Sequence, residues 1–589
     1  MYTMSLKSIR AILLTIAVLG ACLKVVAQKT NAVASINKPI SINDATDYVV
    51  SSIEPFGTKG EIDLTSVDAR LVLQNVKPSE FISQWISHVK VNGEAAVVDE
   101  NILVGPYSNY GAIVTPHAKG FTPLQVFSEA DFQGESKGDY TVDVIYKSLS
   151  DMNNKIRSFT LKRGYMVTMA TNSNGTGYSR CFVADNSDLS INLQPELAGK
   201  VSFLRIVPWH YVSKRGWGGG TLKECDLMNA PWWYNWSAGS QTTPNVEYVP
   251  HKHQIWWPSN TEINAKKNVT HLLGENEPDY PDANGNPAFS VSAVLNEWPN
   301  MYASGLRVGS PACCDANAWL YAFLDSCDAY NYRVDFVALH CYWYMDAKDW
   351  VKRLDEIHKK VKRPIWITEM NYGANWTGWP LGDDRSASDA NQKLYKEKMT
   401  AITRALDSLD YVERYCIFNW VEDCRAMILD ATPDTTVTLA GIAYANGGNL
   451  RQAYSEKQAV APAWRYVAPA APQVVLTPTK MSAKVSWKDN NGELTDSLVV
   501  ERSLDGGDFK PIETLYYNNK TQYSITDNLP APKNVSYRVK IYCADGKSHT
   551  SAATTLSLTS TEGTEAFQFG RLSGSCRNDN FAFFSPRSA

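Results

Sequence analysis

Two glutamates stand where apolar, strand-like runs of the sequence end. Glu277 closes the run in "HLLGENEP" (271–278) and directly follows Asn276, and Glu369 closes the run in "RPIWITEM" (363–370). Two facing carboxyl groups about 5 to 5.5 Å apart can cleave a glycosidic bond, one as nucleophile and the other as acid and then base. The amide of Asn276 would hold the sugar 2-hydroxyl, whose hydrogen bonds strengthen in the transition state. We therefore expect Glu277 and Glu369 to be catalytic.

Aromatic and imidazole side chains at other strand ends form a candidate substrate-binding set. Aromatic faces suit the flat rings of sugars, and a histidine there could hydrogen-bond a carboxylate or a sugar. Together with Asn276, the set is Tyr234, Trp236, His340, Tyr342, Trp343, Tyr344, Trp376 and Trp420. For each of these residues taken singly, a structural role in packing is the competing interpretation.

Three more residues near these strand ends allow two interpretations each. Glu275 is a third carboxylate that could raise the pKa of the acid or bind a substrate hydroxyl, or could point into the wall of the domain and pair with a cation. His251 and His253 in "PHKH" could bind a metal, but no third ligand is evident and a two-carboxylate mechanism requires none. We expect neither a metal nor any other cofactor.

The elements that carry these residues alternate between strand and helix over residues 200–467. Before the last strand, Tyr395, Met399, Ile402 and Leu406 recur at helical spacing. Eight strands with crossover helices predict a (β/α)8 TIM barrel, which places functional side chains at the carboxyl ends of its strands. A doubly wound open sheet is the alternative, but the sequence has no glycine-rich nucleotide motif. The eight expected strand segments are 201–209, 231–237, 247–254, 271–278, 305–311, 335–344, 363–370 and 413–420.

Regions rich in strand signals flank the expected barrel. Residues 35–115 and 120–200 contain short alternating runs and predict N-terminal all-β domains. No linker precedes residue 201, so we expect the second of these domains to share a packed interface with the barrel. Residues 470–559 have strands at the spacing of a β-sandwich, and residues 560–589 show no period and are expected to be disordered.

The N-terminus predicts an export signal over residues 1–27. Lys7 and Arg10 precede an apolar run that is too short to span a bilayer. Cys22 ends a "LGAC" sequence that fits a bacterial lipobox, so the protein would be a lipoprotein anchored in a bacterial membrane. Cleavage near Ala27 and release as a secreted protein is the alternative.

Composition limits the partners and the use of cysteine. With 589 residues and a formal net charge of −4, the chain shows nothing that suggests nucleic acid as a partner, and we expect a monomer. None of the eleven cysteines forms a C-x-x-C pair, so buried free thiols are expected rather than disulfides or a zinc site. Six of them fall in the central region, namely Cys313, Cys314, Cys327, Cys341, Cys416 and Cys424.

Several motifs resemble a known family. The Asn-Glu pair ending at Glu277, taken with Glu369, resembles the clan A retaining glycosidases. The runs "YNW" (234–236), "LLGENEPD" and "WITEMNYGANW" resemble glycoside hydrolase family 128, a family of β-1,3-glucanases. The resemblance covers about residues 200–465 and implies that Glu277 is the acid/base and Glu369 the nucleophile. It also implies that the ring of Trp420 lies beneath the sugar in the subsite where the bond breaks.

The sequence departs from that family at Glu275, where the family is expected to have an aromatic residue. Two flanking regions show resemblances of their own. "FSEADFQG" (127–134) resembles the folded hairpin of βγ-crystallin Greek keys, and "NNKIRSF" (153–159) resembles their calcium loop. Arg157 replaces the Ser or Thr ligand, so no calcium is expected. Residues 470–559 resemble a fibronectin type III module, whose core positions correspond to Trp487, Leu529 and Tyr537.

These observations predict an exported hydrolase that cleaves β-1,3-glucan of the laminarin or curdlan type. We expect the enzyme to cut bonds inside the glucan polymer by the retaining double displacement. The flanking domains would act as spacers or as glycan-binding attachments. Two alternatives remain open. Another clan A glycanase, acting on β-1,4-glucan, mannan or xylan, would use the same carboxylates. A glycan-binding lipoprotein without activity would keep the barrel as a scaffold.

Overall fold

The computed structural model describes residues 29–283, 285–429, 436–448, 451–452, 454, 464–477, 481–518, 520–530 and 534–557. The expected export signal with Cys22 and the expected disordered tail lie outside the described residues. The chain divides into two compact units, Met1–Arg465 and Tyr466–Ala589. Among the described helices, none is both long and apolar enough to cross a membrane.

The first β-region has two sheets, in which some neighbours pair in parallel. One sheet is β1 (Lys29–Val33), β3 (Thr46–Val50), β5 (Arg70–Leu73), β9 (Gly111–Pro116), β8 (Ile102–Ser108) and β18 (Tyr211–Val212). The other is β2 (Pro39–Ile42), β4 (Glu61–Leu64), β6 (Val89–Val91) and β7 (Glu94–Ala95), and the short α2 (Pro78–Glu80) precedes β6. Buried aliphatic residues such as Leu64, Leu71 and Val89 form a core of their own.

The second β-region consists of two four-stranded antiparallel sheets. They are β11 (Ser136–Lys137), β10 (Leu124–Phe127), β13 (Ser158–Leu161) and β16 (Leu189–Asn192), and β12 (Ile145–Tyr146), β17 (Phe203–Pro208), β14 (Tyr165–Ala170) and β15 (Ser179–Ala184). All six residues of β14 are buried, because it is an interior strand between β17 and β15. The predicted β-rich character of both N-terminal regions is confirmed.

Eight parallel strands follow, and they carry the candidate site. They are β19 (Arg215–Gly218), β20 (Trp232–Tyr234), β21 (Glu247–Tyr248), β22 (His271–Leu272), β23 (Arg307–Val308), β24 (Val337–Cys341), β25 (Ile365–Met370) and β26 (Val412–Phe418). Every residue of β24 and β25 is buried, as expected for parallel strands covered on both faces.

Strand pairing links these eight segments in a closed order. Six of them form one sheet, in the order β21-β20-β19-β26-β25-β24, and β22 pairs with β23. Parallel bridges join the two sets, His251 with Leu273 and Gly309 with Phe336. Each strand therefore lies between two neighbours, and the carboxyl ends of all eight lie at the same edge.

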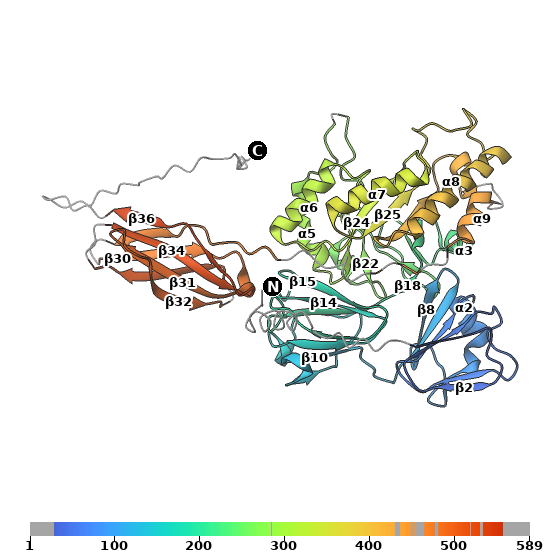
Figure 1. The fold of residues 1–589 in the computed structure, drawn as a ribbon, viewed down its shortest axis with the longest axis horizontal. Coiled ribbons are helices and arrows are strands. Elements are labelled where there is room, and N and C mark those ends of the chain that lie inside the picture. The colour runs from blue at the N-terminus through green and yellow to red at the C-terminus, as the bar shows by residue number, and fades with distance from the viewer. Residues whose placement is uncertain are drawn as a thin grey trace, which may run out of the picture. The chain divides into compact units, whose positions relative to one another are not determined.

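Helices connect the strands and cover them from outside. They are α3 (Leu222–Leu227), α4 (Asn260–Asn264), α5 (Val291–Tyr302), α6 (Ala318–Tyr330), α7 (Ala347–Val361), α8 (Asp389–Asp407) and α9 (Leu439–Ala445), with a hairpin of β27 (Ile428–Leu429) and β28 (Thr436–Val437) before α9. Figure 1 shows α5, α6, α7 and α8 side by side along this region. Ser259, Ser290 and Asn317 accept backbone N–H bonds and cap the first turns of α4, α5 and α6.

One expected strand is wrong. The run 201–209 does not begin the parallel set, because it forms β17 and pairs in antiparallel register with β14, Ile206 opposite Val167. A continuous apolar run can be buried equally well in either kind of sheet, so periodicity alone does not distinguish them. The first parallel strand is β19, whose Gly216 leaves no room for a Cβ against the ring of Trp232. The other seven expected segments each overlap a strand of the set.

The second β-region and the parallel strands share the packed interface that we expected. Thr168 Oγ1 donates to Gly305 O at 2.8 Å, and Arg205 Nη1 of β17 donates to Ser304 O at 2.7 Å. From the other side, Arg333 Nε donates to Ser179 Oγ at 3.1 Å. Thr168, Arg205 and Arg333 are all buried, so this interface excludes water.

The second unit is built from two antiparallel sheets around its own core. They are β29 (Gln473–Thr477), β30 (Ser482–Lys488) and β33 (Gln522–Asn528), and β32 (Lys510–Tyr516), β31 (Thr495–Leu504), β34 (Asn534–Cys543) and β35 (Ser548–Thr550), with β36 (Thr554–Ser557) also on β34. Trp487, Leu529 and Tyr537 all belong to the core, and Tyr537 OH donates to Asp527 Oδ2 at 2.6 Å.

The cysteines of the described residues are free thiols. All are buried except Cys181 and Cys314, which are half-buried. The prediction of free thiols in place of disulfides is confirmed for these residues. Burial raises the pKa of thiols such as Cys327, Cys341 and Cys416, so they remain protonated at neutral pH.

Candidate active site

Glu277 is placed by a close approach between the chain after β22 and the chain after β23. Gly274 lies so near this second segment that a Cβ would be 2.7 Å from Pro311 N, which only glycine permits. Three residues further on, Glu277 N donates to Ala312 O at 2.8 Å. The backbone of Glu277 has a φ of 42°, in the left-handed region that a side chain disfavours.

Glu369 lies near the end of β25 and accepts hydrogen bonds from two aromatic side chains. Trp236 Nε1 donates to Oε1 at 2.9 Å, and Tyr342 OH donates to Oε2 at 2.5 Å. Tyr234 OH lies 3.4 Å from Oε1 but donates to Thr368 O at 2.9 Å. The glutamate is 5% exposed. Each of its oxygens therefore has an aromatic donor that orients the carboxylate.

His340 lies between the two glutamates. Its Nδ1 is 2.8 Å from Glu277 Oε1 and 3.5 Å from Glu369 Oε2. One ligand atom from each of these three residues lies within 4.8 Å of the other two. This geometry brings the two predicted carboxylates together, and it could also hold a metal ion.

The protonation of the site follows from these contacts. Burial raises the pKa of Glu277, but the hydrogen bond and the charge of His340, with a hydrogen bond from Cys314, together outweigh burial and lower the pKa below its usual value. Burial lowers the pKa of His340, and the carboxylates of Glu369 and Glu277 outweigh that effect and raise it. The proton shared by Glu277 and His340 is therefore held mainly on the imidazole. Burial, with the charge of Glu369 in addition, raises the pKa of Tyr342, which remains a donor.

Two expected sugar-binding aromatic residues are corrected by burial. Trp343 is 6% exposed, packs against Trp350 of α7 at a ring distance of 4.8 Å and lies under Arg353. The reason is strand alternation, since Trp343 directly follows Tyr342, which points to Glu369. Tyr234 is 1% exposed, so its hydroxyl reaches Glu369 but its ring has no face for a sugar.

The remaining candidates leave polar or aromatic surface free beside the glutamates. Trp376 is 70% exposed, Trp420 41% and Tyr344 40%. The ring of Trp420 meets that of Trp236 at 6.1 Å, next to Glu369. Asn276 Oδ1, next to Glu277, is buried and has no hydrogen-bond partner within the described chain.

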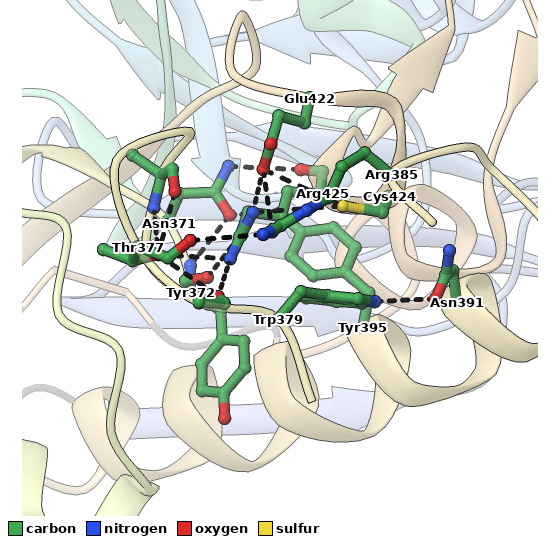
Figure 2. A network of polar contacts seen from close by, with 12 residues as sticks. Asn371, Tyr372, Thr377, Trp379, Arg385, Asn391, Tyr395, Glu422, Cys424 and Arg425 are labelled. Atoms are coloured by element: carbon green, nitrogen blue, oxygen red, sulfur yellow. Dashed lines mark hydrogen bonds and ion pairs between the residues drawn. The ribbon is translucent and has the colours of Figure 1, made fainter. Parts of the chain in front are cut away.

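A polar network joins the loop after β25 to the loop after β26, as Figure 2 shows. Arg425 is at its centre, where Nε donates to Tyr372 O at 2.8 Å and the guanidinium pairs with Glu422. Arg425 is fully buried and stacks on Trp379 at 4.8 Å. Because these loops carry Trp376 and Trp420, the network holds both exposed aromatic residues in place.

Asn371 extends this network to the strand that carries Glu369. Its Nδ2 donates to Phe418 O at 2.9 Å, and Tyr395 OH of α8 donates to its Oδ1 at 2.9 Å. Asn371 is fully buried and lies two residues after the glutamate. The end of β25 is thereby tied both to the next strand and to its helix.

Comparison with known families identifies this region. Residues 221–436 match the family model described as "Glycosyl hydrolase catalytic core". The matched range contains Glu277, His340 and Glu369 and covers less than half of the chain. The predicted resemblance to glycoside hydrolases is confirmed by this match. A comparison with curated proteins found no match.

Solved structures similar to the chain include members of the two families that the motifs resemble. A GH128 (subgroup I) endo-β-1,3-glucanase from Amycolatopsis mediterranei, in complex with laminaritriose, is 26% identical over 40% of this chain and 100% of its own, with a TM-score of 0.34. A GH128 (subgroup IV) endo-β-1,3-glucanase from Lentinula edodes is 16% identical over 35% of this chain and 83% of its own, with a TM-score of 0.28. A βγ-crystallin domain from Flavobacterium johnsoniae is 26% identical over 14% of this chain and 93% of its own, with a TM-score of 0.13. The resemblance of residues 470–559 to fibronectin type III stays a prediction.

Glu275 points away from the reacting region of the glycosyl hydrolase core. It is fully buried, neither carboxylate oxygen has a hydrogen-bond partner in the described residues, and burial raises its pKa to about 7. Lys252 acts on it from nearby, while Lys252 Nζ itself donates to Pro258 O at 2.8 Å. Of the two interpretations of Glu275, the structure favours the one in which the side chain is buried in the wall of the domain, but no cation pairs with it in the described residues.

His251 and His253 do not belong to the metal-binding geometry of the core. His251 is fully buried and neither ring nitrogen has a partner among the described residues, so burial lowers its pKa and keeps it neutral. His253 is half-buried, and Glu369 is close enough to act on its pKa, which burial nevertheless lowers. His253 is thus a residue beside the site that the sequence prediction considered only as a metal ligand.

Three exposed aromatic residues of the core were missed. Trp256 and Trp257 follow the segment that pairs with β22, and Tyr280 lies three residues after Glu277. Each is more than 45% exposed. The consecutive tryptophans just after an expected strand end, and a tyrosine directly after "NEPD", are signals that could have found them.

Proposed function

We propose that this chain is a retaining glycoside hydrolase that cleaves β-1,3-glucan within the polymer. We also propose that the eight parallel strands form a (β/α)8 barrel with the site at its carboxyl-terminal edge. One observation carries the mechanism: a carboxylate oxygen of Glu277 and one of Glu369 lie within 4.8 Å of each other. Retaining enzymes keep their carboxyl groups about 5 to 5.5 Å apart, and inverting enzymes keep them about 6.5 to 9.5 Å apart to admit a water.

Glu369 is the nucleophile in this proposal. Its oxygen attacks the anomeric carbon, the bond from that carbon to the glycosidic oxygen breaks, and a glycosyl-enzyme ester forms. The donors Trp236 and Tyr342 hold the carboxylate in orientation before attack. Asn276, whose Oδ1 is free of protein partners, holds the sugar 2-hydroxyl.

Glu277 supplies and then removes the proton. In the first step the proton held on His340 passes across the 2.8 Å contact to Glu277 and on to the leaving oxygen, which leaves Glu277 as a carboxylate and His340 neutral. In the second step Glu277 accepts a proton from water as the water oxygen attacks the anomeric carbon and releases Glu369, and the proton returns to His340. The two half-reactions return Glu277, His340 and Glu369 to their starting protonation.

The choice of β-1,3-glucan rests on the family-like motifs and on the glycosyl hydrolase match. The clan A alternatives on β-1,4-glucan, mannan or xylan use the same carboxylates, and the non-catalytic alternative uses neither. Export and a lipid anchor at Cys22 remain part of the proposal, and growth with labelled palmitate tests the anchor by its loss in the Cys22→Ala variant.

The deciding experiment digests laminarin, curdlan, β-1,4-glucan, mannan and xylan with the full chain and sizes the products. We expect short oligosaccharides from the β-1,3-glucans, released first as β-anomers in NMR spectra, and no cleavage by Glu369→Gln. Release of α-anomers would exclude the retaining mechanism. Cleavage of mannan or xylan alone would replace β-1,3-glucan as the proposed substrate. Loss of activity with EDTA that added zinc restores would show that Glu277, His340 and Glu369 bind a metal.

A further inference from the structure

The observation that leads beyond the catalytic pair is a group of exposed aromatic side chains on the loops that follow His253 and Glu277. Trp256 is 63% exposed, Tyr280 is 60% and Trp257 is 46%. Elsewhere in this region tryptophans such as Trp298 and Trp350 are completely buried. Large apolar rings left in water forgo the stabilisation that burial would give them, so such a group indicates a surface that binds a ligand.

The loop that carries the two tryptophans is held in one conformation. Gln254 N donates to Trp257 O at 2.8 Å and Trp257 N donates to Gln254 O at 3.1 Å, which closes a tight turn with Trp256 at its tip. Buried Lys252 donates from Nζ to Pro258 O at 2.8 Å and ties the two ends of the loop together. The rings are therefore ordered before any ligand arrives, which lowers the entropic cost of binding.

The loop that carries Tyr280 is continuous with the proposed acid. Tyr280 N donates to Glu277 O at 3.0 Å, and Phe289 N donates to Pro278 O at 3.0 Å, so this loop folds back on itself. The ring of Phe289 meets the ring of Trp256 edge-on at 5.3 Å. The two loops thus form one surface, which we call the aromatic arm and define as Trp256, Trp257 and Tyr280.

The aromatic arm is connected to the catalytic residues through backbone and ring contacts. Asn276 N donates to His253 O at 3.1 Å, and the ring of His253 meets that of Trp257 at 6.0 Å. The arm therefore begins beside Asn276 and Glu277. The exposed aromatic residues on the Glu369 side, Trp376 and Trp420, come from other loops, those after β25 and β26.

We propose that the aromatic arm binds the leaving-group part of the glycan, the sugars released when the bond breaks. The argument rests on the proposed function, in which Glu277 gives its proton to the leaving oxygen and Glu369 bonds to the other sugar. Sugars attached through that leaving oxygen extend on the side of Glu277, where the flat faces of Trp256, Trp257 and Tyr280 are free. The same surface would bind a second glycan chain as acceptor after the first has left, so the arm also favours transfer to sugars over water.

Two substrates separate this role from a general effect on the site. Laminarihexaose has sugars on both sides of the broken bond, whereas 4-nitrophenyl β-laminaribioside has only a small aryl leaving group. In the full chain, Trp256→Ala and Tyr280→Ala should each lower kcat/KM on the hexaose about 10- to 100-fold, the range for truncating an aromatic binding residue. On the aryl glycoside they should change it less than about twofold, because no sugar is present to contact the arm.

Tyr330 provides the matched control, since it is a tyrosine of α6 that is 61% exposed and lies in no part of the arm. Tyr330→Ala should leave both substrates unaffected. Equal losses on both substrates, or an arm variant that behaves like Tyr330→Ala, would overturn the inference while the proposed function stands. Wild-type protein that cleaves no glycan would overturn the proposed function instead. In that case calorimetry with laminarihexaose and the Glu369→Gln chain, with and without Trp256→Ala, decides the arm: equal heats or no binding would reject it.

Discussion

Two clusters in the same set of strands contain the same residue types in opposite roles. At the carboxyl ends lie Glu277, His340 and Glu369, served by neutral donors and one imidazole. At the amino ends, Arg307 binds Glu413 through both guanidinium nitrogens at 2.6 and 2.8 Å, and the second pair, Arg414 with Glu247, is 2.7 Å apart. All four residues of these pairs are at most 1% exposed.

The two buried histidines show what the choice of partner does. Burial and the nearby charge of Arg414 outweigh the hydrogen bond that His271 donates to Glu247 and lower the pKa of His271 to about 3. The pKa of His340 is raised, because two carboxylates face it with no arginine between them. Arginine neutralises a carboxylate permanently, whereas a titratable partner leaves a proton that can move. We infer that the amino-end cluster serves stability, and in the proposed function the carboxyl-end cluster serves chemistry.

The largest effect that tests this comparison is expected from Glu369→Gln. The amide is a poor nucleophile, so turnover of β-1,3-glucan should fall at least about 10⁴-fold. The melting temperature should stay the same or rise, since one of two neighbouring carboxylates is removed. Initial rates and differential scanning fluorimetry measure the two quantities, and a large fall in melting temperature would contradict the assignment of this cluster to chemistry.

The matched change on the next strand is Glu413→Gln, and it should reverse the pattern. It leaves the Arg307 guanidinium buried without its counter-charge, which costs about 3–5 kcal/mol of unfolding free energy. The turnover of each folded molecule should be unchanged. Urea unfolding and active-site titration measure these effects. Arg307→Met added to Glu413→Gln should regain more than half of the loss, and failure to do so would show that the pair is not the cause.

Glu275 extends the comparison because its carboxyl group pairs with neither an arginine nor a histidine in the described residues. Its folded-state pKa is about 7, above the ordinary value of 4.5, so between these values the folded chain holds a proton that the unfolded chain has released. The unfolding free energy should therefore fall as pH rises through this window, by about 3 kcal/mol in total. In Glu275→Gln that fall should be absent, making the variant the more stable protein at pH 8. Equal pH dependence of unfolding for both proteins would show that Glu275 titrates normally.

The smallest expected effect is a shift in the pH profile. In the wild type the proton for Glu277 is held by the Glu277–His340 pair, and the raised pKa of His340 sets the alkaline limb of activity. His340→Asn leaves the proton to the carboxyl group alone, so the alkaline limb should move to lower pH. His271→Asn is the control, because that histidine is already neutral. The measurement is the profile of kcat/KM against pH. If the alkaline limb moves in both variants, the proposal that only His340 carries a proton used in the reaction is wrong.

Residue type and local spacing made part of this site predictable. Glu277 and Glu369 were singled out because each carboxylate ends an apolar run, and the structure brings them together. The helix α8 was predicted from the spacing of Tyr395 and Met399. The buried face of Trp343 was predictable as well, since alternation along a strand separates it from Tyr342.

Other features depend on contacts between segments far apart in the sequence. β19 contains two glycines and no apolar run, and its strand conformation depends on the fit of Gly216 against Trp232. The buried pairing of Arg307 with Glu413 joins residues more than one hundred positions apart. No local pattern distinguishes such charges from surface charges, because only the closing of the strand order brings them together.

The left-handed backbone at Glu277 has a consequence for the history of the site. A side chain at that φ costs about 1–2 kcal/mol relative to glycine. Selection for folding alone therefore favours Glu277→Gly at this position, and only a continuing need for the carboxylate opposes it. In a lineage that lost its substrate, selection for folding would therefore remove Glu277 earlier than Glu369, which lies in β25. Loss of Glu277 with Glu369 still present would then mark descendants that had lost the activity.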